Sequence, residues 1–331
     1  MVRRFLLLIT LALTISLGRE PLSSYASPIA QSSTQPATKI AQAYWDYFNR
    51  ALEKQNRGDN QGAIADYSEA IRLKPNYVAY FNRGTAKYDL GDKQGAIADF
   101  NEAIRLNPDD AYIYVDRGIA KYDLGDKQGG IADFNEAIRL KPDDAHVYVD
   151  LGNAKYDLGD KQGAIADFNE AIRLNPDFAP AYYNRGNAKS DLGDNQGAIA
   201  DYSEAIRLYP DYARAYYNRG AAKSDLGDNQ GAIADYNEAI RIKPDYTSAY
   251  VNRGAAKSDL GDKQGAISDY NEAIRIKPDF APAYYNRGLA KSDSGDRQGA
   301  LTDYRKAAQL YQTQGNTESY QKVIKNIESL Q

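Results

Sequence analysis

From Tyr44 onward, apolar and small residues recur at spacings of three and four, which place them on one face of a helix. In the stretch 179–212, Tyr182, Gly186 and Lys189 have this spacing and predict a first helix. A stronger stripe follows and consists of Ala198, Ile199, Tyr202, Ala205 and Ile206. The pattern therefore predicts two consecutive helices in this stretch.

Helix-end signals separate the two stripes. Gly193 can end the first helix in a left-handed conformation, and Asp194 can cap the second helix by accepting a backbone N–H. Pro210 stops the second helix, because the residue before a proline is pushed out of the helical conformation. The stretch thus predicts a helix hairpin.

The hairpin pattern is repeated along most of the chain. A glycine row with a step of 34 residues consists of Gly84, Gly118, Gly152, Gly186, Gly220, Gly254 and Gly288. The chain therefore divides into eight units, of which the first is one residue shorter, and they cover residues 44–76, 77–110, 111–144, 145–178, 179–212, 213–246, 247–280 and 281–314. A lone hairpin cannot bury its apolar face, so the units must stack.

The last segment, 315–331, predicts a helix that covers the exposed face of unit eight. Asn316 or Thr317 can cap this helix. Its apolar stripe consists of Tyr320, Val323, Ile324, Ile327 and Leu330.

The N-terminus has the pattern of an export signal. Arg3 and Arg4 precede fourteen uncharged, mostly apolar residues, 5–18, which are too few for a spanning helix of about 20 residues. We expect cleavage after Ala26 and export to the periplasm, a thylakoid lumen or the medium; the alternative is an uncleaved N-terminal membrane anchor. Residues 27–43 are rich in Ser, Pro, Ala and Gln and predict a mobile linker, whose last residues either stay in it or join the first helix.

Composition excludes several kinds of site. With no Cys and a single His, the chain has no disulfide, zinc finger, iron–sulfur site or multi-His metal centre, and we expect no cofactor. Lys and Arg (41) are fewer than Asp and Glu (45), which argues against nucleic-acid binding. The acids recur with the period of the repeat, whereas a catalytic pair should occur once. No stretch outside the units exceeds about 45 residues, too short for a catalytic domain.

In order and spacing, the unit resembles the tetratricopeptide repeat signature, at Tyr182, Gly186, Gly193, Ala198, Tyr202, Ala205 and Pro210. The other seven units carry it with minor changes. The resemblance implies an all-α fold: a right-handed superhelical solenoid of eight helix-turn-helix repeats, here with a C-terminal capping helix. It also implies a concave groove, lined by the first helix of each unit, that binds proteins or peptides. The Asn-Arg-Gly and Gly-Asp-x-Gln-Gly-Ala-Ile variant resembles bacterial, cyanobacterial-type members.

One departure from that signature predicts ion pairs. The family usually has Leu before the glycine, whereas seven units have Arg there: Arg50, Arg83, Arg117, Arg185, Arg219, Arg253 and Arg287. Sixteen residues later stand Asp66, Asp99, Asp133, Asp201, Asp235, Asp269 and Asp303. These sites are neighbours in an antiparallel hairpin, so we expect bidentate Arg–Asp pairs. Unit four keeps Leu151, which leaves Asp167 without an Arg.

The resemblance also implies which residues line the groove. The sixth residue of most units is Asn: Asn49, Asn82, Asn184, Asn218, Asn252 and Asn286. Such amides can hold the main chain of an extended peptide, or they bond the adjacent helix or solvent instead. Aromatic residues precede several of them, namely Phe48, Phe81, Tyr183, Tyr217 and Tyr285, and either contact a ligand or pack against neighbouring units.

The twelfth residue divides the groove. It is Tyr88, Tyr122 and Tyr156 in units two to four and Ser190, Ser224, Ser258 and Ser292 in units five to eight. An Asp follows each of them. If these acids point inward, the groove favours a basic or neutral partner; otherwise they are solvated charges at helix ends. Units five to eight are the most uniform, so we expect the ligand there first.

These observations predict an exported, non-catalytic scaffold for proteins or peptides, without specific membrane contact in the mature chain. A structural or assembly role through the convex face or the solenoid ends is the alternative, and an enzyme is a more distant one.

Overall fold

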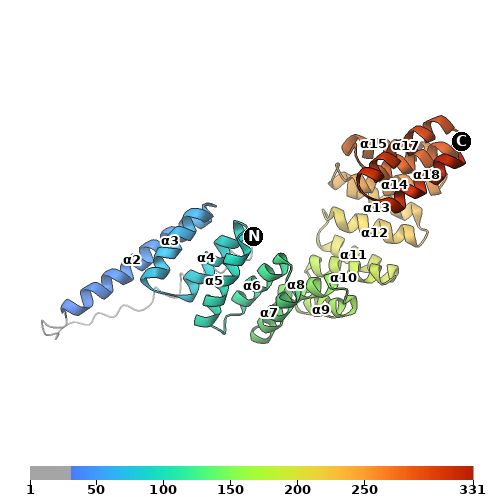
Figure 1. Cartoon of the computed structure of the whole chain (residues 1–331). Coiled ribbons are helices and arrows are strands. Elements are labelled where there is room, and N and C mark those ends of the chain that lie inside the picture. The colour runs from blue at the N-terminus through green and yellow to red at the C-terminus, as the bar shows by residue number, and fades with distance from the viewer. Residues whose placement is uncertain (1–30, 331) are drawn as a thin grey trace.

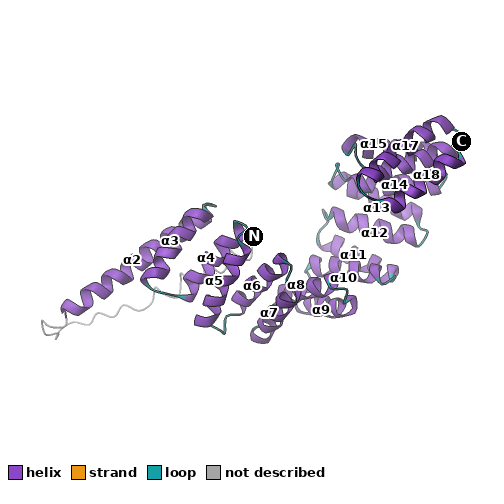
Figure 2. Cartoon of the chain, viewed as in Figure 1, coloured by secondary structure: helices purple, strands orange, loops and turns teal. Residues whose placement is uncertain are grey.

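A computed structural model describes residues 31–330, with side chains from residue 38. Every regular element in this part of the chain is a helix, as expected from the sequence (Figure 2). The predicted export signal, 1–26, lies outside the described residues. None of the described helices combines the length and the apolar character needed to cross a membrane.

The first helix of each unit begins where the repeat pattern places it in units two to eight. These helices are α2 (Gln31–Asn56), α4 (Tyr77–Asp89), α6 (Ala111–Leu124), α8 (Ala145–Asp157), α10 (Ala179–Asp191), α12 (Ala213–Asp225), α14 (Thr247–Asp259) and α16 (Ala281–Asp293).

The second helices return antiparallel to the first and stack in the same order. They are α3 (Asn60–Leu73), α5 (Lys93–Leu106), α7 (Lys127–Leu140), α9 (Lys161–Leu174), α11 (Asn195–Leu208), α13 (Asn229–Ile242), α15 (Lys263–Ile276) and α17 (Arg297–Thr313). The pairs follow one another in a curved row from α2 to α18, so the chain is a helical solenoid (Figure 1).

The turn inside each hairpin has the predicted chemistry. Gly193 has φ +83°, a conformation that other residues rarely adopt. Asp194 Oδ1 then accepts the N–H of Gly197 at 2.9 Å and caps α11. The same Asp cap begins all eight second helices.

Close approach of the two helices explains the glycine row. A Cβ atom on Gly186 would lie 2.7 Å from Cε1 of Tyr202, a fully buried ring on α11. Since interiors are close-packed, a larger residue would force the hairpin apart. The core therefore runs between the helices, filled by alanines and one large ring per unit.

The N-terminal end differs from the predicted pattern, and the C-terminal end agrees with it. Helix α2 begins at Gln31, so 31–43 are helical in a segment assigned to a linker; the good helix formers from Ala37 to Ala43 outweigh the Ser, Pro and Gln around them. At the other end, Asn316 caps α18 (Thr317–Ser329) by accepting the Ser319 N–H at 3.0 Å. Val323 is buried against α17, so α18 covers unit eight as expected.

Candidate functional site

Seven Arg–Asp pairs join the first and second helices of their hairpins. In each pair the Arg Nε donates to Oδ2 of the Asp at 2.7–2.9 Å and Nη2 donates to Oδ1 at 2.5–2.6 Å. The pairs named from the sequence include Arg185–Asp201, Arg219–Asp235 and Arg253–Asp269. Their bidentate geometry makes them strong and directional.

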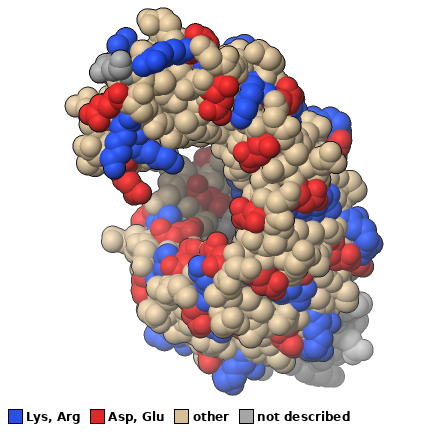
Figure 3. Space-filling model, turned by 90° about the vertical axis from the view of Figure 1, so that its right-hand side faces the viewer, with Lys and Arg blue, Asp and Glu red and all other residues tan. Residues whose placement is uncertain are grey.

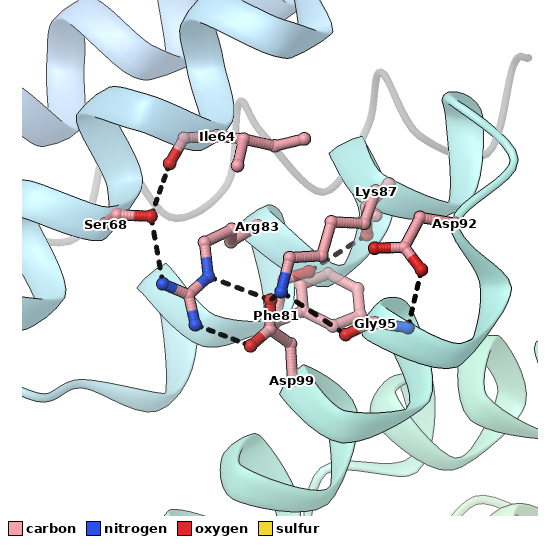
Figure 4. Close-up of polar contacts among 9 residues, drawn as sticks. Ile64, Ser68, Phe81, Arg83, Lys87, Asp92, Gly95 and Asp99 are labelled. Atoms are coloured by element: carbon pink, nitrogen blue, oxygen red, sulfur yellow. Dashed lines mark hydrogen bonds and ion pairs between the residues drawn. The ribbon is translucent and has the colours of Figure 1, made fainter.

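Each of these Asp residues also meets a Lys, and most of the Arg residues reach a third helix. In unit two, Lys87 Nζ lies 2.8 Å from Asp99 Oδ2, and Arg83 Nη1 donates to Ser68 Oγ on α3 at 3.0 Å (Figure 4). Because Arg83 bonds both its own hairpin and the preceding one, it fixes how the two stack. These buried carboxylates are occupied by structural contacts.

Unit four is the exception. Leu151 replaces the Arg, and Asp167 keeps only Lys155, whose Nζ lies 2.7 Å from Oδ2. Burial raises the pKa of Asp167, and Lys155 offsets the rise in part. In unit one, by contrast, the hydrogen bond from Arg50 lowers the pKa of Asp66 to about 2.

The asparagine row is largely used by the protein itself. Asn218 Nδ2 donates to Tyr183 OH at 3.1 Å and to Asn187 Oδ1 at 2.8 Å, both in the preceding unit. Asn184 donates to Asn153 and Asn252 donates to Tyr217 in the same way. Asn218 therefore uses both of its N–H donors within the chain, which corrects the expectation of a free donor there, whereas Asn184 and Asn252 each use one of two. Asn49, Asn82 and Asn286 make no such bond in the described structure.

The aromatic row packs mainly within the chain. Phe48 is only 8% exposed and packs on Tyr44, Trp45 and Tyr67, so it belongs to the core and the groove assignment is wrong there. The other four rings are half-buried against a ring of their own second helix or the ring that ends their own unit: Phe81 on Phe100, Tyr183 on Tyr202 and Tyr212, Tyr217 on Tyr236 and Tyr246, and Tyr285 on Tyr304.

A cavity of about 440 Å³ lies on the inner side of units two to five. Its size is within the usual range of ligand sites. First helices supply most of its wall, from the sixth, ninth, twelfth and thirteenth residues of their units. The lining residues are Tyr88, Ile119, Tyr122, Asp123, Phe134, Asp150, Asn153, Tyr156, Asp157, Phe168, Asn184 and Asn187.

Tyrosine–aspartate bonds link successive units along this cavity. The hydroxyls of Tyr88 and Tyr122 donate to Asp123 and Asp157, and Tyr156 OH donates to Asp191 Oδ2 at 2.6 Å. Burial, and then the bond to the carboxylate, raise the pKa of Tyr122 to about 12. Tyr122 therefore remains a protonated donor at neutral pH.

The cavity is acidic. Asp and Glu side chains gather at the wall of the hollow that the curved row of helices encloses (Figure 3). Three carboxylates line the cavity, and its lining includes neither Lys nor Arg. Among residues 31–330, no group of His, Asp and Glu could hold a metal ion.

The second half of the groove has a different lining. Ser190 and Ser224 replace the tyrosines and donate to Asn195 and Asn229 of their own hairpins at 3.3 and 3.1 Å. Where unit four has Lys161, which pairs with Asp191 at 3.2 Å, units five and six have these two asparagines. Asp225 and Asp259 consequently make neither an ion pair nor a hydrogen bond among the described residues.

Comparison with protein families identifies the repeat. A profile described as "TPR repeat" matches residues 84–125, 152–193, 186–227, 223–261 and 258–295, and one described as "Tetratricopeptide repeat" matches residues 47–77, 111–144 and 281–314. The chain belongs to the tetratricopeptide repeat family. No curated protein matches it.

Solved tetratricopeptide repeat proteins share the fold. One from Parabacteroides merdae is 20% identical and covers 75% of this chain and 99% of its own, with a TM-score of 0.57. The C-terminal part of one from Cytophaga hutchinsonii is 17% identical and covers 72% and 98%, with a TM-score of 0.61. YrrB, described as a TPR protein with an unusual peptide-binding site, is 21% identical and covers 56% and 95%, with a TM-score of 0.49.

The cavity lies in repeats two to five of this tetratricopeptide array, whereas the uniformity of the sequence favoured repeats five to eight as the ligand site. Of the predicted asparagine and aromatic rows, only Asn184 lines it. The twelfth residues Tyr88, Tyr122 and Tyr156, at which the sequence divides the groove, line it as well. The sequence signal for this cavity is the change from Tyr to Ser at the twelfth residue, because tyrosine side chains are long enough to form its wall and serine side chains are not. Repeats two to five are therefore the best-formed candidate site.

Proposed function

We propose that this protein is an exported, non-catalytic bacterial scaffold that binds a protein or peptide in its concave groove, chiefly at repeats two to five. The observation that supports this most is the cavity of about 440 Å³, whose polar and aromatic wall comes from the inner helices. Tyr122 and Tyr156 are half-buried beside this space, although the fold accepts serine at the same place in later repeats.

An extended ligand fits the spacing of this wall. Repeats three and four each add a Tyr and the Asp that follows it, and repeats four and five each add an Asn at the ninth residue, so similar contacts recur along the groove. Because Asn153 Oδ1 and Asn187 Oδ1 already accept from Asn184 and Asn218, the Nδ2 groups of Asn153 and Asn187 are the donors that can meet a peptide carbonyl. The wall has no nucleophile–base pair among its lining residues, which supports binding without chemistry.

The export part of this proposal rests on residues 1–26. Purification of the protein from its native cell, followed by fractionation and N-terminal sequencing, tests it. We expect the exported fraction to contain a chain that begins at Ser27. A chain that keeps Met1 and stays with the membrane would favour the anchor instead.

A double substitution tests the groove. Tyr122→Ser with Tyr156→Ser gives repeats three and four the residue that repeats five to eight already carry, so the fold should persist. We expect residues 27–331 with these changes to lose partners that the unchanged protein captures from the exported fraction, as identified by mass spectrometry. Arg207→Ala, an exposed change on α11, is the matched control and should keep them.

An assembly role through the solenoid end is the second candidate. Ile40 and Trp45 on α2 are 48% and 41% exposed, which leaves an apolar surface at the N-terminal end. If the groove variant keeps every partner and Trp45→Ser loses them, this role replaces the proposed one.

A further inference from the structure

We propose that the cavity of repeats two to five receives a Lys or Arg side chain from an extended segment of a partner protein. This inference rests on the proposed function and specifies the chemistry of the ligand. It is drawn from the charge of the wall, from its aromatic residues and from one ammonium group that the wall already holds.

Charge is the first argument. Asp123, Asp150 and Asp157 line the cavity, whereas Lys127 contacts Asp157 from outside this lining. A concave site with walls of one sign concentrates its own field and attracts ligands of the opposite sign. An acidic ligand would meet like charges, which makes a cationic segment the complementary partner.

The aromatic residues are the second argument. Tyr88, Tyr122 and Tyr156 line the cavity, and their hydroxyls are held by aspartates of the following repeat. Because each ring is fixed at its hydroxyl end, little side-chain entropy remains to be lost when a ligand binds. A cation beside a tyrosine face gains a cation–π attraction in addition to the carboxylate.

Lys127 shows that this wall accepts an ammonium group. It stands at the start of α7, and its Nζ lies 3.4 Å from Asp157 Oδ2 and 5.8 Å from the centre of the Tyr122 ring. These are the two contacts that we infer for the ligand. A second carboxylate, Asp150, lines the same cavity on α8 and adds to the negative charge of the wall.

Labelled peptides test the inference by fluorescence anisotropy. The probes are a fluorescein-labelled nonapeptide of alternating Lys and Ala and the same peptide with Gln for every Lys. We expect the Lys peptide to bind at least about tenfold more tightly, with the difference shrinking at high salt. Unlabelled spermidine, a free polyamine, should compete much less than unlabelled Lys peptide.

Matched variants locate the binding. Asp157→Asn should weaken binding of the Lys peptide about fivefold, and Asp150→Asn should add to the loss. Asp225→Asn changes the same position two repeats later, outside the cavity, and should leave binding within about twofold. Circular dichroism of each variant checks that the solenoid is folded.

Three results would overturn the inference: equal binding of the Gln peptide, equal loss in the Asp157 and Asp225 variants, or full displacement by spermidine at the concentration of competing peptide. They would leave the proposed function intact if Tyr122→Ser with Tyr156→Ser still loses its captured partners. Unchanged capture by that double variant would overturn the proposed function itself.

Discussion

The groove has two halves with the same frame and different linings. In repeats two to four, Tyr88, Tyr122 and Tyr156 bond the aspartates of the next repeat and border a cavity. In repeats five to eight, serines stand in their place. The hairpin turns, the Asp caps and the Arg–Asp pairs are the same in both halves, apart from the missing Arg of repeat four.

This difference separates the residues that build the solenoid from those that define its surface. The first group recurs with the period of 34 and faces other helices. The second group varies at the twelfth residue and at the start of the second helix, where Lys161 pairs with Asp191 but Asn195 leaves Asp225 unpaired. Substitutions in the first group should therefore affect both halves alike, and substitutions in the second should not.

The largest effect is expected from the buried carboxylates. Asp133→Ala in the first half and Asp235→Ala in the second should each lower the free energy of unfolding by about 3 kcal/mol, because each leaves an Arg and a Lys without their partner. Asp167→Ala should cost much less, since no Arg depends on it. Urea unfolding followed by circular dichroism measures all three; a cost at Asp167 equal to the others would contradict the structural role given to the Arg.

The tyrosines should have the next largest effect. Tyr122→Ser removes a half-buried ring and its bond to Asp157, and should lower the free energy of unfolding by about 1–2 kcal/mol. Conversely, Ser190→Tyr would bring a phenol toward Asp225, 35 residues later, and should raise it by up to about 1 kcal/mol. Thermal unfolding measures both; a loss on Ser190→Tyr would show that the frames of the two halves differ after all.

Opposite pH dependence should distinguish two of the aspartates. The folded pKa of Asp66 is about 2, below its ordinary value of 3.8, so its stabilising contribution is present above pH 4 and is lost as the pH falls toward 2. The folded pKa of Asp167 is raised, so protonated Asp167 favours the folded state and the ionised form opposes it as the pH rises.

Asn substitutions measure these two slopes. The stability deficit of Asp66→Asn relative to the unchanged protein should shrink between pH 4 and pH 2. Asp167→Asn should become relatively more stable as the pH is raised from 3 to 7. Urea unfolding across this range is the measurement, and parallel curves for the two variants would refute the assignment of opposite shifts.

Sequence reasoning predicted the frame because its signals are local. Gly193 and Asp194 determine a turn by themselves, and the spacing of sixteen between Arg185 and Asp201 follows from the geometry of one hairpin. The resemblance to a known repeat supplied the stacking of the hairpins, and the described helices agree with it.

The lining could not be predicted in the same way because it depends on neighbouring repeats. Whether Asn218 faces a ligand depends on Tyr183 and Asn187, which stand 35 and 31 residues earlier and compete for its amide. Phe48 occupies a groove position of the signature, yet in the first repeat Tyr44 and Trp45 pack on its ring and bury it. Local pattern alone does not contain these contacts.

The smallest effect on the free energy of unfolding is expected at two asparagines that occupy the same position of their repeats. Asn218→Ala removes two hydrogen bonds to the preceding repeat and should cost about 1 kcal/mol of unfolding free energy. At Asn286 the corresponding residues of the preceding repeat are Val251 and Ala255, which have no side-chain acceptor, so Asn286→Ala should change stability by less than about 0.5 kcal/mol. The same urea titration measures both. Equal costs would mean that the amide acts through its own helix; the expected inequality would mean that Asn286 keeps both its donor and its acceptor for water or for a bound peptide.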